Sequence, residues 1–369
     1  MKLTAQLKLQ PTPEQADVLR RTLETANAAC NFISRVAWDT RTFGKFALQQ
    51  LCYQKVRETF GLSAQMTIRS IAKVADAYKL DRKTQRAYRP HGGIAYDDRI
   101  LSFNLKRQTV SIWTVADKRR QTIPFVCGER QRRLLSSRQG ESDLVFRNGQ
   151  FYLLVTCNVD EPTPDDVDAV LGVDLGITNI AADSDGEQYS GAQAERVRQR
   201  YQRRRDALQS VGTKSAKRRL KTISGKQRRF QSNTNHTIAQ RLVRKAKDSA
   251  RGIALEDLTH IRQRTTVRKS ARAKHSNWSF NQLRRYIWYK AQMCGVRVLL
   301  VDPRSTSQAC NRCGTVDKRN RPDQATFRCV GCGHTNRADV NAACNIRDRA
   351  SVSWPMASNL RVQAQAHLL

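Results

Sequence analysis

The spacing of hydrophobic residues in the first forty positions changes from a period of two to a helical period. Apolar and polar residues alternate from Lys2 to Gln10, which predicts a half-buried strand. Thr12, followed by a proline and by Gln15, forms the start signature of a helix with a capping box. We therefore expect a strand and then a helix over residues 13–36.

Helical spacing continues over residues 45–60 and 64–80, and after residue 97 the period returns to two. Asn148-Gly149, between two apolar runs, supplies the positive φ angles of a two-residue hairpin turn. These patterns predict a helical insert within a small β-barrel or curled sheet that includes the first strand. The acidic, proline-bearing stretch 160–166 then predicts a domain boundary.

Three acidic residues in the second half lie at the ends of predicted elements. The apolar run 171–180 delivers Asp174, a second apolar strand ends in Glu256 and Asp257, and Asp339 opens a helical run. An acid on a strand is often only a surface residue, but three acids at such positions can converge on a pair of hard divalent cations. Strand parity alone does not choose between Glu256 and Asp257.

Four cysteines have the spacing of a zinc ribbon. Cys310 and Cys313 form one Cys-x-x-Cys-Gly knuckle, and Cys329 and Cys332 form the other. Four unligated buried cysteines are the alternative. Since four protein ligands leave no open coordination position, we expect the zinc to be structural. Asp339 follows the second knuckle closely, so the zinc is also expected to position that acid.

The charge of the chain points to a polyanionic partner. It has 66 Lys and Arg against 32 Asp and Glu, a net charge of +34, and nucleic acid is the most common polyanion that such a protein binds. A membrane surface is the rival, but no run of about 18 apolar residues is present. We find no signal-peptide core, and the remaining six cysteines lie in apolar segments, so we expect a reducing, intracellular location without membrane contact.

The positive charge concentrates between residues 195 and 251, where nineteen Lys and Arg stand against three acids. A solvated helix face is the alternative, but the imbalance favours contact with a phosphate backbone. The eight basic candidates are Arg203, Arg204, Arg205, Lys217, Arg218, Arg219, Arg228 and Arg229. Aromatic residues that either stack on bases or belong to the core are Trp278, Phe280 and Trp288.

Several motifs occur in a fixed order between Leu171 and Ile346. They are Gly-Val-Asp-Leu-Gly at 172–176, Leu-Glu-Asp-Leu at 255–258, Trp-Ser-Phe at 278–280 leading to Gly295, residues 302–314 with the first knuckle, and Asp-Val-Asn-Ala-Ala at 339–343. Together they strongly resemble the transposon-encoded TnpB proteins, compact RNA-guided DNA endonucleases related to type V CRISPR effectors. The N-terminal half resembles this family only in its layout.

The resemblance implies a multidomain α+β protein. Its nuclease domain would be RuvC-like, with a ribonuclease-H-like α/β fold, and would carry an inserted four-cysteine zinc ribbon. The implied domains are a wedge-like β-barrel at 1–10 and 90–160, a helical recognition-like insert at 11–89, the nuclease domain at 167–304 and 335–350, a target nucleic-acid-binding zinc ribbon at 305–334, and a tail at 351–369.

The family pattern selects Asp174, Glu256 and Asp339 as catalytic acids and as ligands of two Mg²⁺ or Mn²⁺ ions. It also implies a guide RNA derived from the transposon and a double-stranded target DNA beside a short adjacent motif. The protein would lie in a prokaryotic cytoplasm, in association with the nucleoid.

One departure from the family pattern is the sequence Asn-Arg-Ala at 336–338, where many relatives carry a further acid and arginine. Alternatives are a guide-dependent repressor that does not cleave, and a strand-transferring transposase. The oligomeric state is left open.

Overall fold

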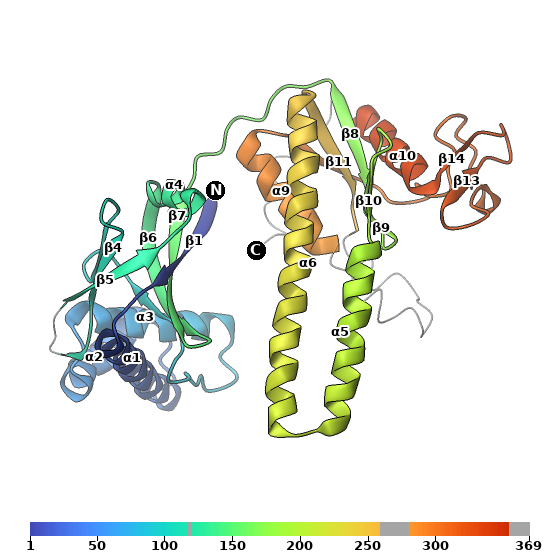
Figure 1. Ribbon diagram of the computed structural model, residues 1–369. Helices are drawn as coiled ribbons and strands as arrows, with labels where there is room; N and C mark the ends of the chain where they lie inside the picture. Colours follow the sequence, from blue (N-terminus) through green and yellow to red (C-terminus); the bar gives the residue numbers. More distant parts are fainter. Residues whose placement is uncertain (117–119, 259–279, 354–369) are drawn as a thin grey trace. The chain divides into compact units, whose positions relative to one another are not determined.

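The computed structural model describes residues 1–116, 120–258 and 280–353 (Figure 1). Trp278 and the part of the predicted tail after Ser353 lie outside these residues. The chain divides into two compact units, Met1–Asp160 and Glu161–Leu369, and each is described separately. Among the described helices, none combines the length and the hydrophobicity needed to span a bilayer.

A curled antiparallel sheet forms the centre of the first unit, with strand order β2-β6-β7-β1-β5-β4-β3. The first strand of the chain, β1, pairs with β7 on one side and β5 on the other, as expected from its alternating pattern. Among the described residues no pairing joins β2 to β3, so the sheet is an open half-barrel. The strands are β1 (Lys2–Leu9), β2 (Ile94–Tyr96), β3 (Leu101–Asn104), β4 (Thr109–Trp113), β5 (Arg120–Val126), β6 (Arg138–Arg147) and β7 (Gln150–Asn158).

The first helix of this unit begins where its capping signal predicts. Thr12 Oγ1 accepts a hydrogen bond from Gln15 N at 3.2 Å, and Gln15 Oε1 accepts one from Thr12 N at 3.1 Å, which completes the capping box. Buried residues on the first and third helices, such as Leu23 and Ile71, join the core of the sheet. The helices are α1 (Pro13–Asp39), α2 (Lys45–Phe60), α3 (Ala64–Leu80) and the unexpected short α4 (Glu129–Leu135).

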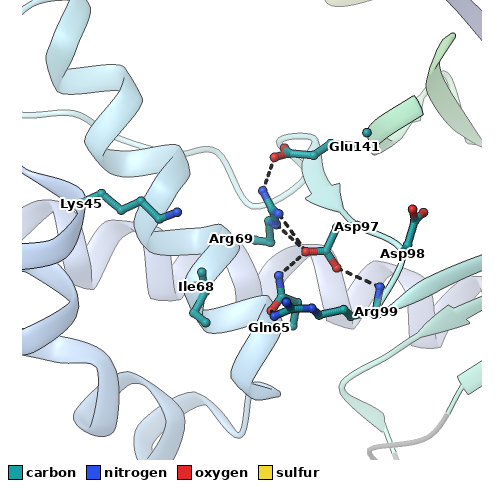
Figure 2. A pocket seen from close by; sticks show the side chains of 9 residues that line it. Lys45, Gln65, Ile68, Arg69, Asp97, Asp98, Arg99 and Glu141 are labelled. Atoms are coloured by element: carbon teal, nitrogen blue, oxygen red, sulfur yellow. Dashed lines mark hydrogen bonds and ion pairs between the residues drawn. The ribbon is translucent and has the colours of Figure 1, made fainter. Parts of the chain in front are cut away.

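Partly buried ion pairs join the helical insert to the sheet (Figure 2). Arg69 of α3 donates from Nη2 to Asp97 Oδ2 at 2.8 Å, and its other terminal nitrogen contacts Glu141 in β6. These residues line a cavity of about 470 Å³. The cations and acids in the cavity wall already pair with one another. These ion pairs therefore hold α3 to the sheet and do not indicate a ligand-binding site.

A five-stranded mixed sheet organises the second unit, with strand order β10-β9-β8-β11-β12. The neighbours β8, β11 and β12 run parallel, whereas β9 and β10 are antiparallel additions beside β8. The mixed sheet agrees with the α/β character expected for this half of the chain. The strands are β8 (Ala169–Asp174), β9 (Asn179–Asp183), β10 (Gln188–Ser190), β11 (Arg251–Glu256) and β12 (Val298–Val301).

Helices cover both faces of this sheet, so alternate strand residues are buried on opposite sides. Val173 and Leu255 pack against residues of α6 and α9, whereas Val170 and Ala254 pack against Ile346 of α10. In Figure 1 the antiparallel pair α5 and α6 extends beyond the sheet, and its turn contains Gly212 with a φ of +67°. The helices are α5 (Ala192–Val211), α6 (Lys214–Asp248), α9 (Phe280–Cys294) and α10 (Ala338–Ser353).

Candidate active site

Asp174 and Glu256 are the last residues of two neighbouring strands. β8 ends at Asp174 and β11 ends at Glu256. The strands are parallel, with Leu255 opposite Val173, so the two acids leave the sheet at the same edge. The carboxyl edge of such a sheet is where α/β proteins commonly bind ligands. The fold therefore places two of the three predicted acids side by side.

The adjacent acid, Asp257, has different surroundings. Asp257 Oδ1 lies 3.4 Å from Arg284 Nη1 of α9, whereas Glu256 Oε1 accepts a hydrogen bond from the hydroxyl of Thr306. The negative charge of Glu256 also raises the pKa of Asp174. The geometry therefore separates two acids that strand parity could not separate.

Asp339 lies in the first turn of α10, and α10 packs closely against β8. A Cβ atom on Gly172 of β8 would lie 2.0 Å from the carbonyl oxygen of Ala343 and 2.6 Å from the backbone nitrogen of Arg347. Only glycine permits this approach. Asn179 of β9 donates from Nδ2 to Asp339 Oδ2 at 2.8 Å, which fixes the carboxylate over the sheet edge.

The electrostatics of the three acids reflect their proximity. Burial raises the pKa of Asp174 well above its ordinary value, and the negative charges of Glu256 and Asp339 raise it further. Burial also raises the pKa of Glu256, although the hydrogen bond from Thr306 opposes the rise. A set of carboxylates without histidine or cysteine fits a hard cation such as Mg²⁺ or Mn²⁺.

The acids are more widely spaced than the cysteines described below. Among the described residues, only the four cysteines bring three or more potential ligand atoms within 4.8 Å of one another. Asp174, Glu256 and Asp339 are thus neighbours that interact through their charges, and they form a looser group.

Arg321 is a member of the site that the sequence did not reveal. Its Nη2 lies 3.9 Å from Asp339 Oδ1, and its charge lowers the pKa of Asp174 against the effect of the neighbouring acids. It lies between the two cysteine knuckles, 18 residues before Asp339, where no periodic pattern marks it. A cation that interacts with both Asp339 and Asp174 can contact an anionic substrate group at the same edge.

The four cysteines meet as their spacing predicts. Cys310 and Cys332 have sulfurs 3.7 Å apart, and those of Cys313 and Cys329 are 3.5 Å apart. Thr315 lies 3.2 Å from Cys313 Sγ, and its hydrogen bonds lower the pKa of that thiol to about 6, which favours the thiolate that binds metal. Thiolates in this number suit a closed, tetrahedral zinc site.

The cysteine cluster is directly connected to the helix that carries Asp339. The hairpin of β13 (Thr326–Arg328) and β14 (Thr335–Arg337) lies around the second knuckle, and α10 begins at the next residue, Ala338. Ala338 is fully buried and belongs to the same small core as Cys310 and Phe327. The cysteine cluster and the first turn of α10 therefore share one packed unit.

The eight basic candidates lie on α5 and α6. Seven are exposed, and the eighth, Arg205, is half-buried and donates to Gln227. Within the part of the chain that the structure describes, none of the eight has a carboxylate within 4.0 Å. Their charges are therefore available to a partner.

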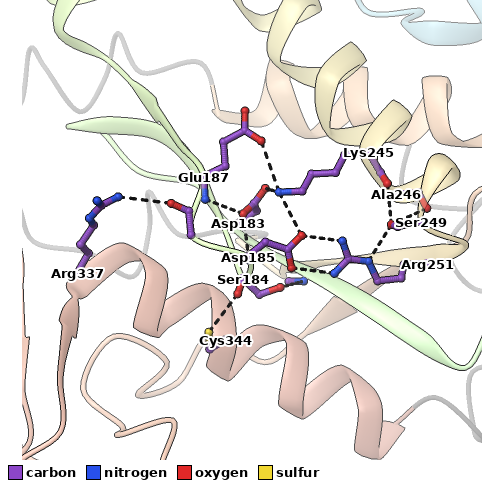
Figure 3. Close-up of polar contacts among 12 residues, drawn as sticks. Asp183, Ser184, Asp185, Glu187, Lys245, Ala246, Ser249, Arg251, Arg337 and Cys344 are labelled. Carbon is purple, nitrogen blue, oxygen red and sulfur yellow. Dashed lines mark hydrogen bonds and ion pairs between the residues drawn. The ribbon is translucent and has the colours of Figure 1, made fainter.

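The base of the helical pair is held to the sheet by ion pairs (Figure 3). Lys245 of α6 contacts the buried Asp183 at 2.6 Å and Asp185 at 3.1 Å, both near the β9–β10 turn. Arg251 donates two hydrogen bonds to Asp185, at 2.8 and 2.7 Å.

Of the proposed stacking aromatics, Trp288 is half-buried in α9, and the side chain of Phe280 lies outside the described residues.

Two protein families match this chain in succession. Residues 153–261 match the OrfB_IS605 family, described as "Probable transposase", and residues 280–346 match the family described as "Cas12f1-like, TNB domain". The first match includes Asp174 and Glu256, and the second includes the four cysteines and Asp339.

Individual relatives agree with these matches. The chain is 31% identical over 218 residues to the CRISPR-associated endodeoxyribonuclease Cas12f1 of Sulfoacidibacillus thermotolerans, which covers 54% of this chain and 50% of the relative. It is 28% identical over 197 residues to the TnpB-like protein MJ0751 of Methanocaldococcus jannaschii, covering 50% of this chain and 69% of the relative. The chain spans 50%, 37% and 40% of the length of three Cas12f relatives that it matches.

A solved structure shares the fold over most of the chain. The Cas12f1 protein in a cryo-EM structure of the Cas12f1–sgRNA–target DNA complex superposes with a TM-score of 0.60 and 15% identity, covering 91% of this chain and 83% of that chain. The predicted resemblance to TnpB proteins is confirmed by the family models that match residues 153–261 and 280–346 and by relatives named TnpB-like and Cas12f1.

Proposed function

We propose that this protein is an RNA-guided DNA endonuclease that hydrolyses phosphodiester bonds of a target DNA. The observation that carries the proposal is Asp174, a half-buried acid at the end of β8 whose charged neighbours include Glu256 and Asp339. Relatives named as endodeoxyribonucleases support this activity, and the family model matched by residues 153–261 covers the strands that carry the first two acids.

In this proposal Asp174, Glu256 and Asp339 hold two divalent cations, Mg²⁺ or Mn²⁺. When bound, such ions activate a water and stabilise the leaving 3′ oxygen during phosphodiester hydrolysis. Asn179 keeps the Asp339 carboxylate oriented, and Arg321 offers a positive charge to the phosphate. The cysteine cluster holds zinc and has a structural role.

The partners in this proposal are a guide RNA derived from a transposon and a double-stranded target DNA. The net charge of +34 and the unpaired cations of α5 and α6 support contact with a nucleic acid backbone. The first unit would contain the wedge-like sheet and the recognition-like helices, and the zinc ribbon would bind target nucleic acid. Base pairing would read the sequence, and the protein would read a short motif beside the target.

The test begins with the protein purified from cells that also carry its native locus, followed by sequencing of the bound RNA. That complex is incubated with Mg²⁺ and a plasmid library that places random sequence beside a matched target. We expect cleavage of the matched target beside a single short motif, dependent on the RNA. Bound RNA and target DNA without cleavage would instead indicate a guided repressor.

A transposase is the second candidate, because one matching family carries that description. A transposase joins a freed 3′ end to a new strand, whereas the proposed nuclease only hydrolyses. Labelled transposon ends separate the two activities, since joined products form only in the first case. Joined products without any RNA requirement would refute the proposed function.

A matched pair of variants tests the assignment of the second acid. Glu256→Gln is expected to abolish cleavage because it removes a carboxylate beside Asp174, whereas Asp257→Asn is expected to retain it. The two substitutions make the same chemical change at adjacent positions. Loss of cleavage in Asp257→Asn with retention in Glu256→Gln would reverse the assignment.

A further inference from the structure

One face of α10 carries three polar residues at intervals of four, Asn341, Asn345 and Arg349. Residues with this spacing lie above one another along a helix. All three contact the segment 302–311, which leads from β12 to the first cysteine knuckle. The last of them, Arg349, donates from Nη1 to the carbonyl oxygen of Asp302 at 2.8 Å.

The two asparagines hold the middle of that segment. Asn345 Nδ2 donates to the carbonyl oxygens of Thr306 at 2.8 Å and Ala309 at 2.7 Å. Asn341 Nδ2 donates to the same oxygen of Ala309 at 2.8 Å, and its Oδ1 accepts from Asn311 N at 3.2 Å. Both asparagine side chains are buried, so water does not compete for these hydrogen bonds.

The segment connects two functional groups. Thr306 is 2% exposed, and its hydroxyl donates to Glu256 while lying 3.0 Å from the carbonyl oxygen of Pro303. Four residues later, Cys310 belongs to the cysteine cluster. Because α10 also carries Asp339, a single helix links two of the acids to the cysteines.

We propose that Thr306 is a positioning residue that holds the Glu256 carboxylate at the carboxyl edge of the sheet, and that Asn345 holds Thr306 through its backbone carbonyl. The inference rests on the proposed function, because it concerns the same group of acids. A glutamate has three rotatable side-chain bonds, so a ligand at a strand end needs a second contact to keep one orientation. Groups that orient metal ligands in this way commonly contribute 10–100-fold to metal affinity or activity.

The test compares Thr306→Val with Thr306→Ser in the full chain bound to its RNA. Valine keeps nearly the shape of threonine without the hydroxyl, whereas serine keeps the donor. The first measurement is Mn²⁺ binding by calorimetry, and the second is the Mg²⁺ concentration at half-maximal cleavage. For Thr306→Val we expect about tenfold weaker Mn²⁺ binding and about a tenfold higher Mg²⁺ requirement, and Thr306→Ser is expected to restore both.

Wild-type Mn²⁺ affinity in Thr306→Val would overturn the proposal. Equal losses in Thr306→Val and Thr306→Ser would also overturn it, because the hydroxyl would then not be the group that matters. If the wild-type complex cleaves no DNA, the proposed function fails, and the Mn²⁺ comparison still decides the role of Thr306. A somewhat lower midpoint of thermal unfolding is expected in Thr306→Val, since a buried, hydrogen-bonded hydroxyl is removed, whereas Thr306→Ser is expected to keep most of the wild-type stability.

Discussion

Gly172 lies where β8 and α10 are packed too closely to leave room for a side chain. An added Cβ would lie 2.0 Å from the carbonyl oxygen of Ala343 and 2.9 Å from the Cβ of Arg347. Contacts under 3.0 Å are essentially never seen for real Cβ atoms, so α10 must move away from β8 by roughly 1 Å in Gly172→Ala. The movement would carry Asp339 away from Asp174.

The expected magnitudes follow from that displacement. Overpacking of this kind costs about 1–3 kcal/mol in the free energy of unfolding. A misplacement of about 1 Å at a reacting group can cost on the order of 10²-fold in rate. We therefore expect Gly172→Ala to remain folded at 25 °C, with a lower free energy of unfolding and cleavage reduced by about two orders of magnitude.

The assay combines urea unfolding with single-turnover cleavage of a matched target. Gly225→Ala, at a partly exposed position of α6, is the matched control, because its nearest neighbour is the flexible end of Arg229 at 3.3 Å. That control is expected to be neutral or up to about 1 kcal/mol more stable, since alanine favours a helix. If Gly172→Ala unfolds and cleaves like the wild type, the close packing of α10 on β8 does not position Asp339.

Three further predictions concern the zinc ribbon, the basic helices and the ion pairs at their base. Cys310→Ser is expected to lose both cleavage activity and the bound zinc, which mass spectrometry measures. Cys294→Ser, at an exposed free thiol, is the control and is expected to keep both. Retained zinc in Cys310→Ser would contradict the assignment. Glutamine in place of the eight basic candidates should weaken RNA or DNA binding and reduce its salt dependence by about 0.9 per lost phosphate contact, without changing the unfolding midpoint; an unchanged salt slope would refute their role. Hydrogen bonds from Arg251 lower the pKa of Asp185 to about 2 from 3.8, so its stabilisation is present above pH 3.8 and disappears as the pH falls through about 2. Because Asp185 is partly exposed, Asp185→Asn should cost only about 1 kcal/mol at neutral pH in urea unfolding, and a difference that grows toward low pH would contradict this sign.

Much of the fold could be predicted because its signals are local. The capping box at Thr12 and the Asn148-Gly149 turn, with φ angles of +52° and +78°, need only a few neighbouring residues. By contrast, α4 buries only Leu135, so its sequence has no periodic apolar pattern from which the helix could be predicted. The break between α5 and α6 at Gly212 was also missed, although the αL glycine there is an ordinary helix end.

The candidate site was predictable only in part. Asp174 ends a short apolar run and Asp339 opens a helical run, so both are recognisable from local sequence. The spacing of the cysteines alone indicates a tetrahedral metal site. The contacts of Arg321 and Thr306 join residues 18 and 50 positions apart, so no local pattern contains them. The choice of Glu256 needed the family resemblance, and the structure supplies a physical reason for it in the hydrogen bond from Thr306.

The central claim is that Asp174 belongs to a cleavage site that acts on a guided target. The most direct measurement is single-turnover cleavage, with Mg²⁺, of a matched and a scrambled DNA by the RNA-bound wild type and by Asp174→Asn. We predict that the wild type cleaves only the matched DNA and that cleavage falls to background in Asp174→Asn. RNA and target binding should remain unchanged, because the substitution removes no basic side chain. Cleavage of the matched DNA by Asp174→Asn at the wild-type rate would contradict the account.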